Sequence, residues 1–176
     1  MSCLNFIANF NETIKGSIKF HQCSTKSEVI VIFDLHNIKP CQTYACHIHE
    51  YGDTTDGCKS LGSHLNLTNK NHGTIFFDIK NSHTGDLVNN INSDKDGKVK
   101  FYYSDPRLNL FGNVVKSILG CSIVIHDGQD DYGLGGDVES LKTGNAGERM
   151  TWSVIGKAKS SEIDLNLLKF VSYLDI

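Results

Sequence analysis

Histidines and acidic residues recur along this chain at spacings that suit metal binding. His47 and His49 are separated by a single residue, so in a β-strand, where side chains alternate between two faces, both would project from the same surface. Two imidazoles on one face can hold one ion. Further along, His83 and Asp86 pair a nitrogen with a carboxylate, and Gly85 between them permits the tight turn that would bring both side chains together. These two half-sites predict a metal centre with one or two ions.

Three further histidines, His64, His72 and His126, extend the pattern at widening intervals. A cluster of this size in 176 residues indicates a metal centre more strongly than any single pair. His21 and His36 stand apart from it. A lone histidine on a strand is usually an ordinary surface or core residue, and that is our expectation for both.

Length and composition indicate one domain. A chain of 176 residues with 39% hydrophobic residues can bury one sizeable core. The formal net charge is −3 and the basic residues are scattered, which argues against nucleic-acid binding and against an anionic membrane surface. No apolar run approaches the ~20 residues needed to span a bilayer. Residues 1–10 lack the basic start and long apolar core of a signal peptide, so we expect a soluble, cytoplasmic protein.

The cysteines do not form a recognisable pattern. No two of them have CxxC spacing, so we expect most to be ordinary thiols. The six are Cys3, Cys23, Cys41, Cys46, Cys58 and Cys121. A glycosylation sequon begins at Asn66, two residues after His64, and a glycan there would crowd the site. This favours a compartment without glycosylation.

Short segments rich in Ile, Val, Phe and Tyr alternate with clusters of Gly, Asn, Asp and Ser, which predicts strands. The clearest segments are 14–20, 29–35, 98–103, 121–125 and 151–158. The Asp-Gly pair within residues 94–97 predicts a hairpin turn between flanking strands. With about eight strands and no sustained helical period, an antiparallel sandwich or barrel is the natural fold class.

Two stretches and the tail depart from this strand pattern. Residues 50–84 and 127–149 are long, glycine-rich and poor in periodic apolar residues, and loops of that length are usually functional. The candidate ligands lie on these loops or at their edges. In the tail, Ile163, Leu167 and Phe170 recur at steps of three or four residues, as in a short amphipathic helix.

Taken in order, these motifs resemble the copper/zinc superoxide dismutase family over residues 1–158. The motifs are His47-x-His49-Glu-Tyr-Gly-Asp53, Gly57-Cys58, Gly62-x-His64-x-Asn66, His72-Gly73, His83-x-Gly-Asp86, His126 and Gly144-Asn-Ala-Gly147-x-Arg149. The resemblance implies an all-β, eight-stranded antiparallel Greek-key barrel or sandwich with two long functional loops. Residues 159–176 would then be a short C-terminal extension, either packed on the domain or disordered.

The resemblance also implies two metal sites that share one residue. Copper would be bound by His47, His49, His64 and His126, and zinc by His64, His72, His83 and Asp86, with His64 bridging as an imidazolate. The donor types agree with this assignment. All-imidazole ligation suits copper, whereas three nitrogens and one carboxylate close a tetrahedral, structural zinc site.

Two further residues match functional positions of the family. Asp130 matches a carboxylate that bonds a copper histidine and a zinc histidine, and Arg149 matches the arginine that attracts and orients the substrate anion. The implied reaction converts superoxide to oxygen and hydrogen peroxide by Cu(II)/Cu(I) cycling. In the reduced state His64 would release copper and carry a proton, so His64 and Arg149 are the implied catalytic residues.

The chain departs from the family at one disulfide. The family bonds the cysteine that matches Cys58 to a cysteine three residues after the arginine, but Trp152 occupies that position here. Either another cysteine substitutes, with Cys121 as the candidate partner, or packing holds the loop.

The leading hypothesis is an active, antioxidant superoxide dismutase, an oxidoreductase that the resemblance implies is a homodimer. The alternative is a weak or inactive homologue that binds metal or a copper chaperone, as the missing cysteine would allow. A zinc-stabilised binding module is a third reading, but it would not need His47, His49, His126 and Arg149.

Overall fold

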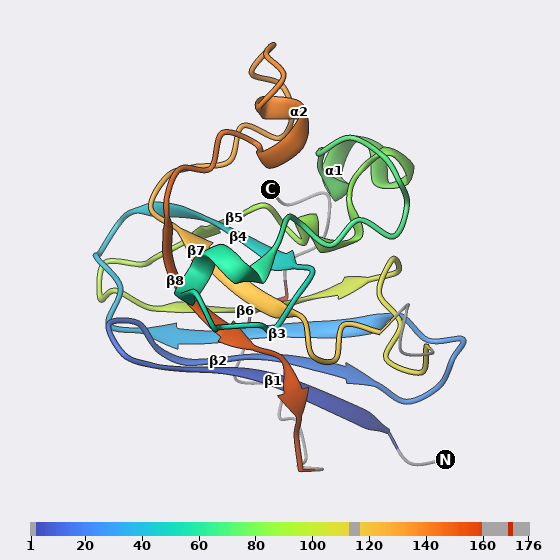
Figure 1. Ribbon diagram of the computed structural model, residues 1–176. Coiled ribbons are helices and arrows are strands. Elements are labelled where there is room, and N and C mark those ends of the chain that lie inside the picture. The colour runs from blue at the N-terminus through green and yellow to red at the C-terminus, as the bar shows by residue number, and fades with distance from the viewer. Residues whose placement is uncertain (1–2, 113–116, 160–168, 171–176) are drawn as a thin grey trace.

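Two β-sheets that share one hydrophobic core form the body of the protein (Figure 1). The structure is a computed structural model that describes residues 3–112, 117–159 and 169–170. The first sheet has the order β10-β6-β3-β2-β1-β9. Its strands are β1 (Leu4–Asn11), β2 (Lys15–Gln22), β3 (Val29–His36), β6 (Val99–Asp105), β9 (Gly156–Lys157) and β10 (Lys169–Phe170).

The second sheet is smaller and carries the metal-site histidines. Its order is β5-β4-β7-β8, and all its neighbours are antiparallel. The strands are β4 (Thr43–His49), β5 (Asn90–Asn92), β7 (Ser122–His126) and β8 (Arg149–Val154). Every residue of β7 is buried, whereas β1 alternates between buried and more exposed positions along its length. The second sheet is therefore covered on both faces at its centre.

The core between the sheets follows from this alternation of side chains. Phe20 and Phe33 from the first sheet and Ile48 and Ile123 from the second are fully buried in a single cluster. Burying side chains of this size contributes roughly 1.5–3 kcal/mol each. The core fixes the second sheet, and with it the side chains of β4 and β7.

Most of the predicted strands are confirmed, but the predicted hairpin is wrong. Residues 94–97 do form a turn, in which the Gly97 amide donates to the Asp94 carbonyl at 3.1 Å. However, β5 before the turn pairs with β4, and β6 after it pairs with β3, so the chain crosses from one sheet to the other. An Asp-Gly turn fixes a chain reversal but does not decide which strands pair.

The all-β class is confirmed, with two differences in detail. The described residues form ten strands rather than about eight, and β9 and β10 have only two residues each. Within the described ranges, the two sheets are not joined into a closed barrel. Residues 169–170 pair in parallel with β6, while 160–168 and 171–176, where most of the predicted amphipathic helix falls, lie outside the described residues.

The two long loops include the short helices α1 (Ile75–Asp78) and α2 (Ser140–Thr143), which lie at the top in Figure 1. The first carries η1 (Gly57–Leu61), α1 (Ile75–Asp78) and η2 (Ile79–Asn81), followed by η3 (Thr84–Asp86). The second carries α2 (Ser140–Thr143). None of the described helices is long and apolar enough to cross a membrane.

A buried arginine ties the first long loop to the first sheet. The guanidinium of Arg107 donates to the two carboxylate oxygens of Asp105 at 3.1 and 2.7 Å. It also donates to Ser82 Oγ, the His83 carbonyl and the Leu87 carbonyl, each at 3.0 Å. The side chains are 7% and 0% exposed, so neither charge has water as an alternative partner. This pair fixes the loop on both sides of η3.

We expect Arg107→Met to lower the free energy of unfolding by about 3–5 kcal/mol, because it leaves the Asp105 carboxylate buried and unpaired. Urea denaturation measures the change. The matched control is Lys100→Met, which breaks the half-exposed Lys100–Asp34 pair and should change stability by less than about 1 kcal/mol. Equal effects of the two substitutions would show that the buried pair does not anchor the loop.

Candidate metal centre

Two adjacent strands of the second sheet present three of the candidate ligands to the long loops. β4 carries His47 and His49 on one face, and β7, which pairs with β4, ends at His126. The pairing of β7 with β8 is irregular between Ile125 and His126. A bulge at this position re-aims a side chain at the end of a strand. All three histidines are at most 4% exposed.

The first long loop brings His64 to these strands. His64 forms an isolated antiparallel bridge with His49, and its ring centroid lies 4.0 Å from that of His47. The ligand atoms of the four histidines predicted to bind copper, His47, His49, His64 and His126, all lie within 4.8 Å of one another. The predicted set is thus assembled from two strands and one loop.

Hydrogen bonds leave one ring nitrogen on each of these four histidines without a partner among the described residues. His49 Nδ1 donates to the Gly62 carbonyl at 3.0 Å, and His126 Nδ1 donates to the Gly147 carbonyl at 3.1 Å. The unpaired atoms are His47 Nδ1, His49 Nε2, His64 Nε2 and His126 Nε2. Buried polar atoms are normally bonded, so four convergent exceptions indicate space for an ion.

The second predicted set surrounds Asp86. Its Oδ1 atom lies 3.2 Å from His64 Nδ1, 2.9 Å from His72 Nδ1 and 3.2 Å from His83 Nδ1. The ligand atoms of the four residues lie within 4.8 Å of one another, and the side chain of Asp86 is 0% exposed. His64 belongs to both sets, and its two ring nitrogens face different sets.

The reason for a glycine at position 85 differs from the one expected. Its backbone is not left-handed, but an added Cβ would lie 2.3 Å from the Ile48 carbonyl oxygen and 3.0 Å from the Leu65 amide nitrogen. Gly85 is therefore required because η3 approaches β4 closely. This approach brings His83 and Asp86 to His64.

Asp130 joins the two sets. Its Oδ2 accepts a hydrogen bond from His47 Nε2 at 2.6 Å, and its Oδ1 accepts one from His72 Nε2 at 3.0 Å. Each bond fixes the ring so that Nδ1 faces the metal set. A carboxylate in this position sets the tautomer and raises the basicity of the ligand nitrogen.

Two asparagines that the sequence analysis did not single out hold Asp130. Asn89 donates to the Gly73 carbonyl at 2.8 Å and to Asp130 Oδ1 at 3.2 Å. The Asn90 side chain bonds both backbone groups of Asp130, at 2.9 and 3.0 Å. Asn89 also has a left-handed backbone, with φ of 59°. Asn89 and Asn90 gave no signal in the sequence alone, since a pair of asparagines is also typical of an ordinary turn.

Burial and charge separate the pKa values within the cluster. Burial lowers the pKa of His64 to about 3 and that of His126 to about 4, and it also lowers that of His49. For His72 burial is outweighed by hydrogen bonds to Asp130 and Asp86, which raise its pKa to about 9. For Asp86, burial is outweighed by hydrogen bonds from His64, His72 and His83, which hold its pKa well below the usual range. Neutral histidines are the form that binds metal.

An open cleft of about 830 Å³ leads to the first set. Its walls include His64, His126, Arg149, Glu139 and Glu148. The cleft thus combines one guanidinium near the histidines with carboxylates from the second long loop.

Arg149 is fixed by two backbone carbonyls of the first long loop. Its Nη2 donates to the Gly62 carbonyl at 2.6 Å, and its Nη1 donates to the Cys58 carbonyl. Gly62 also accepts from His49, so the guanidinium and this candidate ligand share one anchor.

The predicted bridge between Cys58 and Cys121 is wrong, because both are free thiols. Cys121 Sγ instead donates to the Glu50 carbonyl at 3.3 Å, and burial raises the pKa of its thiol to about 11, which keeps it protonated. The alternative explanation, packing, has support at Trp152. A Cβ placed on Gly57 would lie 3.9 Å from the indole ring, so the ring packs against the start of η1.

Comparisons with known proteins agree on one family. The family model described as "Copper/zinc superoxide dismutase (SODC)" matches residues 14–155. "Superoxide dismutase [Cu-Zn]" of Paramecium bursaria Chlorella virus 1 is 43% identical over 155 residues, covering 88% of this chain and 79% of that protein. The protein of the same name from Schizosaccharomyces pombe is 44% identical over 145 residues, covering 82% and 91%. The solved structure "Crystal Structure Analysis of the clock protein EA4" aligns with a TM-score of 0.78 at 37% identity, covering 89% of this chain and 96% of that one.

We expect the metal-free protein to lose stability as the pH falls from 6.5 to 5. In this range the unfolded chain takes up protons on histidines that stay neutral in the folded state, because the pKa values of His47, His49, His64 and His126 are lowered by burial. The limiting slope is about 1.4 kcal/mol per pH unit for each such histidine. The raised pKa of His72 acts in the other direction, but its contribution is fully present below pH 6.5 and is lost only as the pH rises toward about 9.

Urea denaturation of chelator-treated protein at several pH values measures this slope. His126→Gln removes one of the titrating histidines. It should therefore reduce the slope of the unfolding free energy against pH by up to about 1.4 kcal/mol per pH unit. A free energy of unfolding that stays constant between pH 6.5 and 5 would contradict the burial of neutral histidines.

Proposed function

The chain belongs to the copper/zinc superoxide dismutase family, and we propose that it converts superoxide to oxygen and hydrogen peroxide at the cluster of six buried histidines and Asp86. The single observation that carries this proposal is the convergence of four unpaired ring nitrogens in one buried group below an open cleft. A zinc-only structural site would need only the group around Asp86.

The donor atoms fit the two metals of the family. His47, His49, His64 and His126 would hold copper, since imidazole nitrogens suit that ion. His64, His72, His83 and Asp86 would hold zinc, with three nitrogens and one carboxylate. Copper held there would supply one-electron redox chemistry, whereas zinc would supply none and would be structural.

The chain itself positions the substrate and the protons. Arg149 presents a fixed positive charge to the cleft, where it would attract and orient a small anion beside His64 and His126. His64 is the proposed proton carrier, because its ring belongs to both metal sets. Asp130 is a positioning residue that acts through His47 and His72.

We also propose a cytoplasmic location. Four of the six cysteines, Cys41, Cys46, Cys58 and Cys121, are free thiols, and the other two, Cys3 and Cys23, form a disulfide. A glycan on the sequon residue Asn66, two residues after His64, would crowd the site, so the proposal requires Asn66 to be unglycosylated. Reduced thiols and an unglycosylated Asn66 both suit the cytoplasm.

A homodimer is the proposed assembly. The apolar side chains of Tyr51, Leu119 and Val154 are 56%, 41% and 39% exposed and line one shallow hollow on the second sheet. Apolar patches of this kind often mark protein interfaces. We also propose that a chaperone protein delivers copper, because the four histidines are buried. The chaperone would bind the same apolar face that a second copy of the chain covers in the dimer.

We expect the metal-loaded protein to dismutate superoxide and His126→Ala to lose that activity together with copper. The loss should exceed the ~10–100-fold typical of a residue that only orients a ligand, which is the loss we expect for Asp130→Asn. The readouts are superoxide decay and metal content by mass spectrometry. His36→Ala, which alters an exposed histidine on β3, is the matched control and should be unchanged. Full copper occupancy without activity would favour the inactive, metal-binding homologue.

We expect the protein to sediment as a dimer, at twice the chain mass of 19.5 kDa, and Val154→Lys to convert it to a monomer. A lysine in the middle of an apolar interface would have to be buried without a partner. Val138→Lys places the same charge on a side chain that is 68% exposed in the second long loop, outside the hollow, and should leave the dimer intact. A monomeric wild-type protein at micromolar concentration would exclude this assembly.

A further inference from the structure

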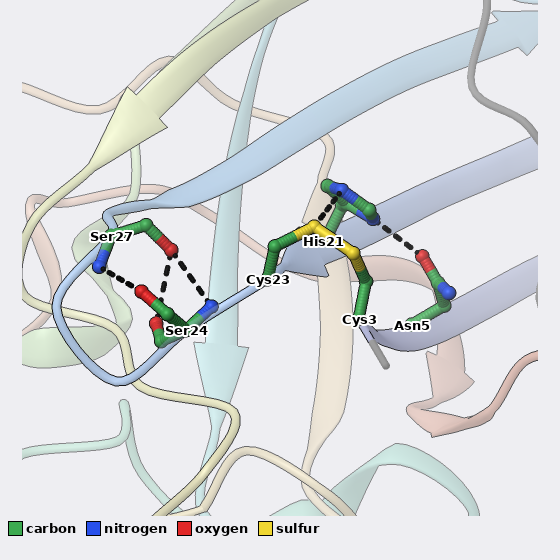
Figure 2. Close-up of a disulfide and its surroundings, with 6 residues drawn as sticks. All are labelled: Cys3, Asn5, His21, Cys23, Ser24 and Ser27. Carbon is green, nitrogen blue, oxygen red and sulfur yellow. Dashed lines mark hydrogen bonds between the residues drawn. A yellow bond between two sulfur atoms is a disulfide. The ribbon is translucent and has the colours of Figure 1, made fainter. Parts of the chain in front are cut away.

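A second group of metal-ligating side chains lies on the other sheet, at the ends of β1 and β2 (Figure 2). Cys3 directly precedes β1 and Cys23 directly follows β2, and the two are joined by a disulfide with a Cα–Cα distance of 3.9 Å. The next pair with the same side-chain direction is Asn5 and His21, which face each other in the strand register. The four residues form two neighbouring cross-strand pairs.

These pairs lie on the outer face of the first sheet. Their neighbours Phe6 and Phe20 point into the core and are at most 3% exposed, whereas Cys3 and His21 are partly exposed and Cys23 is exposed. The pairs are therefore open to solvent and to small molecules, and they share no residue with the buried histidine cluster.

Hydrogen bonding fixes the His21 ring and its tautomer. His21 Nδ1 lies 2.7 Å from Asn5 Oδ1. The amide oxygen can only accept, so Nδ1 carries the hydrogen and Nε2 has a free lone pair. Nε2 lies 3.1 Å from Cys23 Sγ. A histidine whose second nitrogen donates to an oxygen acceptor is the usual arrangement of a metal ligand.

In the disulfide state this lone pair has no good partner. A disulfide sulfur carries no hydrogen, so it cannot donate to Nε2. Burial also lowers the pKa of His21, which keeps the ring neutral near pH 7. In the oxidised state only the bond to Asn5 fixes the His21 ring, and the free lone pair on Nε2 suits a reduced pair in which sulfur and nitrogen face a common ion.

We propose that Cys3, His21 and Cys23 form a further metal site, separate from the buried histidine cluster. It binds one thiophilic ion, Zn²⁺ or Cu⁺, when the disulfide is reduced. The ligand atoms of the three residues lie within 4.8 Å of one another. The register of β1 and β2, in which Leu4 pairs with Gln22, would keep the two cysteines opposite each other in the reduced state as well. Thiolate and imidazole ligands select these ions over Mg²⁺ or Ca²⁺.

The disulfide in the structure is then the oxidised, metal-free form. Oxidation needs one hydrogen peroxide, which is the product of the family's own reaction. The two thiols lose two electrons and two protons as the S–S bond forms, and hydrogen peroxide is reduced to two water molecules. A dithiol reductant reverses the change by taking the S–S bond into its own disulfide. The site would thus release its ion when peroxide accumulates.

The test uses full-length protein and Co²⁺ as a spectroscopic substitute for Zn²⁺. The buried histidine cluster contains no cysteine, so a thiolate-to-cobalt charge-transfer band would report on the Cys3–His21–Cys23 site alone. We expect the band, and one additional ion per chain, in protein reduced with a phosphine that is then removed. Hydrogen peroxide should abolish both and restore the Cys3–Cys23 bond in a peptide map. Competition with a Cu⁺ chelator tests the second ion.

Three variants decide the assignment. Cys23→Ser should abolish the band, and Asn5→Ala should weaken metal binding by about tenfold through loss of ring orientation. Cys41→Ser alters an exposed free thiol outside the group and should leave the band unchanged. The proposal is wrong if reduced wild-type protein shows no thiolate band and no Cu⁺ competition, or if the band survives in Cys23→Ser. Retained superoxide dismutation in Cys23→Ser would show that the two sites are independent.

Discussion

The structure depends on two buried carboxylates, Asp86 and Asp130, which together contact four of the six buried histidines. Burying that many polar rings is unfavourable unless their nitrogens are bonded. Asp86 Oδ1 lies within 3.2 Å of three histidines, and Asp130 bonds His47 and His72. Among the described residues, four of the five ring nitrogens that remain unpaired converge on one group, so the folded chain carries an unfavourable interaction that a metal ion would relieve. Metal binding and stability are therefore coupled in this fold.

The carboxylates can act only because the loops that bear them are fixed to the sheets from several sides. Arg107 ties the carbonyls of His83 and Leu87, on either side of η3, to Asp105. Gly85 lets η3 approach β4, and Trp152 packs on the start of η1. Ion pairing, close backbone contact and aromatic packing are different interactions with one effect. Packing of Trp152 offers a physical reason why this chain can lack a cysteine at that position, since an indole can hold a loop in place without a covalent bond.

The sequence predicted the fold class because strands have a local periodicity. The two ligand sets came from the family resemblance, and the structure brings the same residues together in two groups. Strand pairing was less accessible. The turn at Asp94–Gly97 is visible in the sequence, but whether it closes a hairpin or crosses between sheets depends on the contacts of β5 and β6. The partner of Cys58 was mispredicted for a related reason, since Cys121 faces the Glu50 carbonyl in the folded chain.

The spacing of Cys3, His21 and Cys23 in the sequence already hinted at a metal site, but the six-histidine cluster gave a much stronger signal. His21 and Cys23 stand two residues apart on a strand, as His47 and His49 do, and Cys3 and Asn5 repeat that spacing on the neighbouring strand. Spacing shows which side chains share a face, but only the register of two strands shows that these faces coincide. The same alternation thus places His47 and His49 on the loop-covered face of the second sheet, and the Cys3–His21–Cys23 group on the outer face of the first. A buried ion is held by shape and burial, whereas an exposed one can exchange and respond to the redox state of its cysteines.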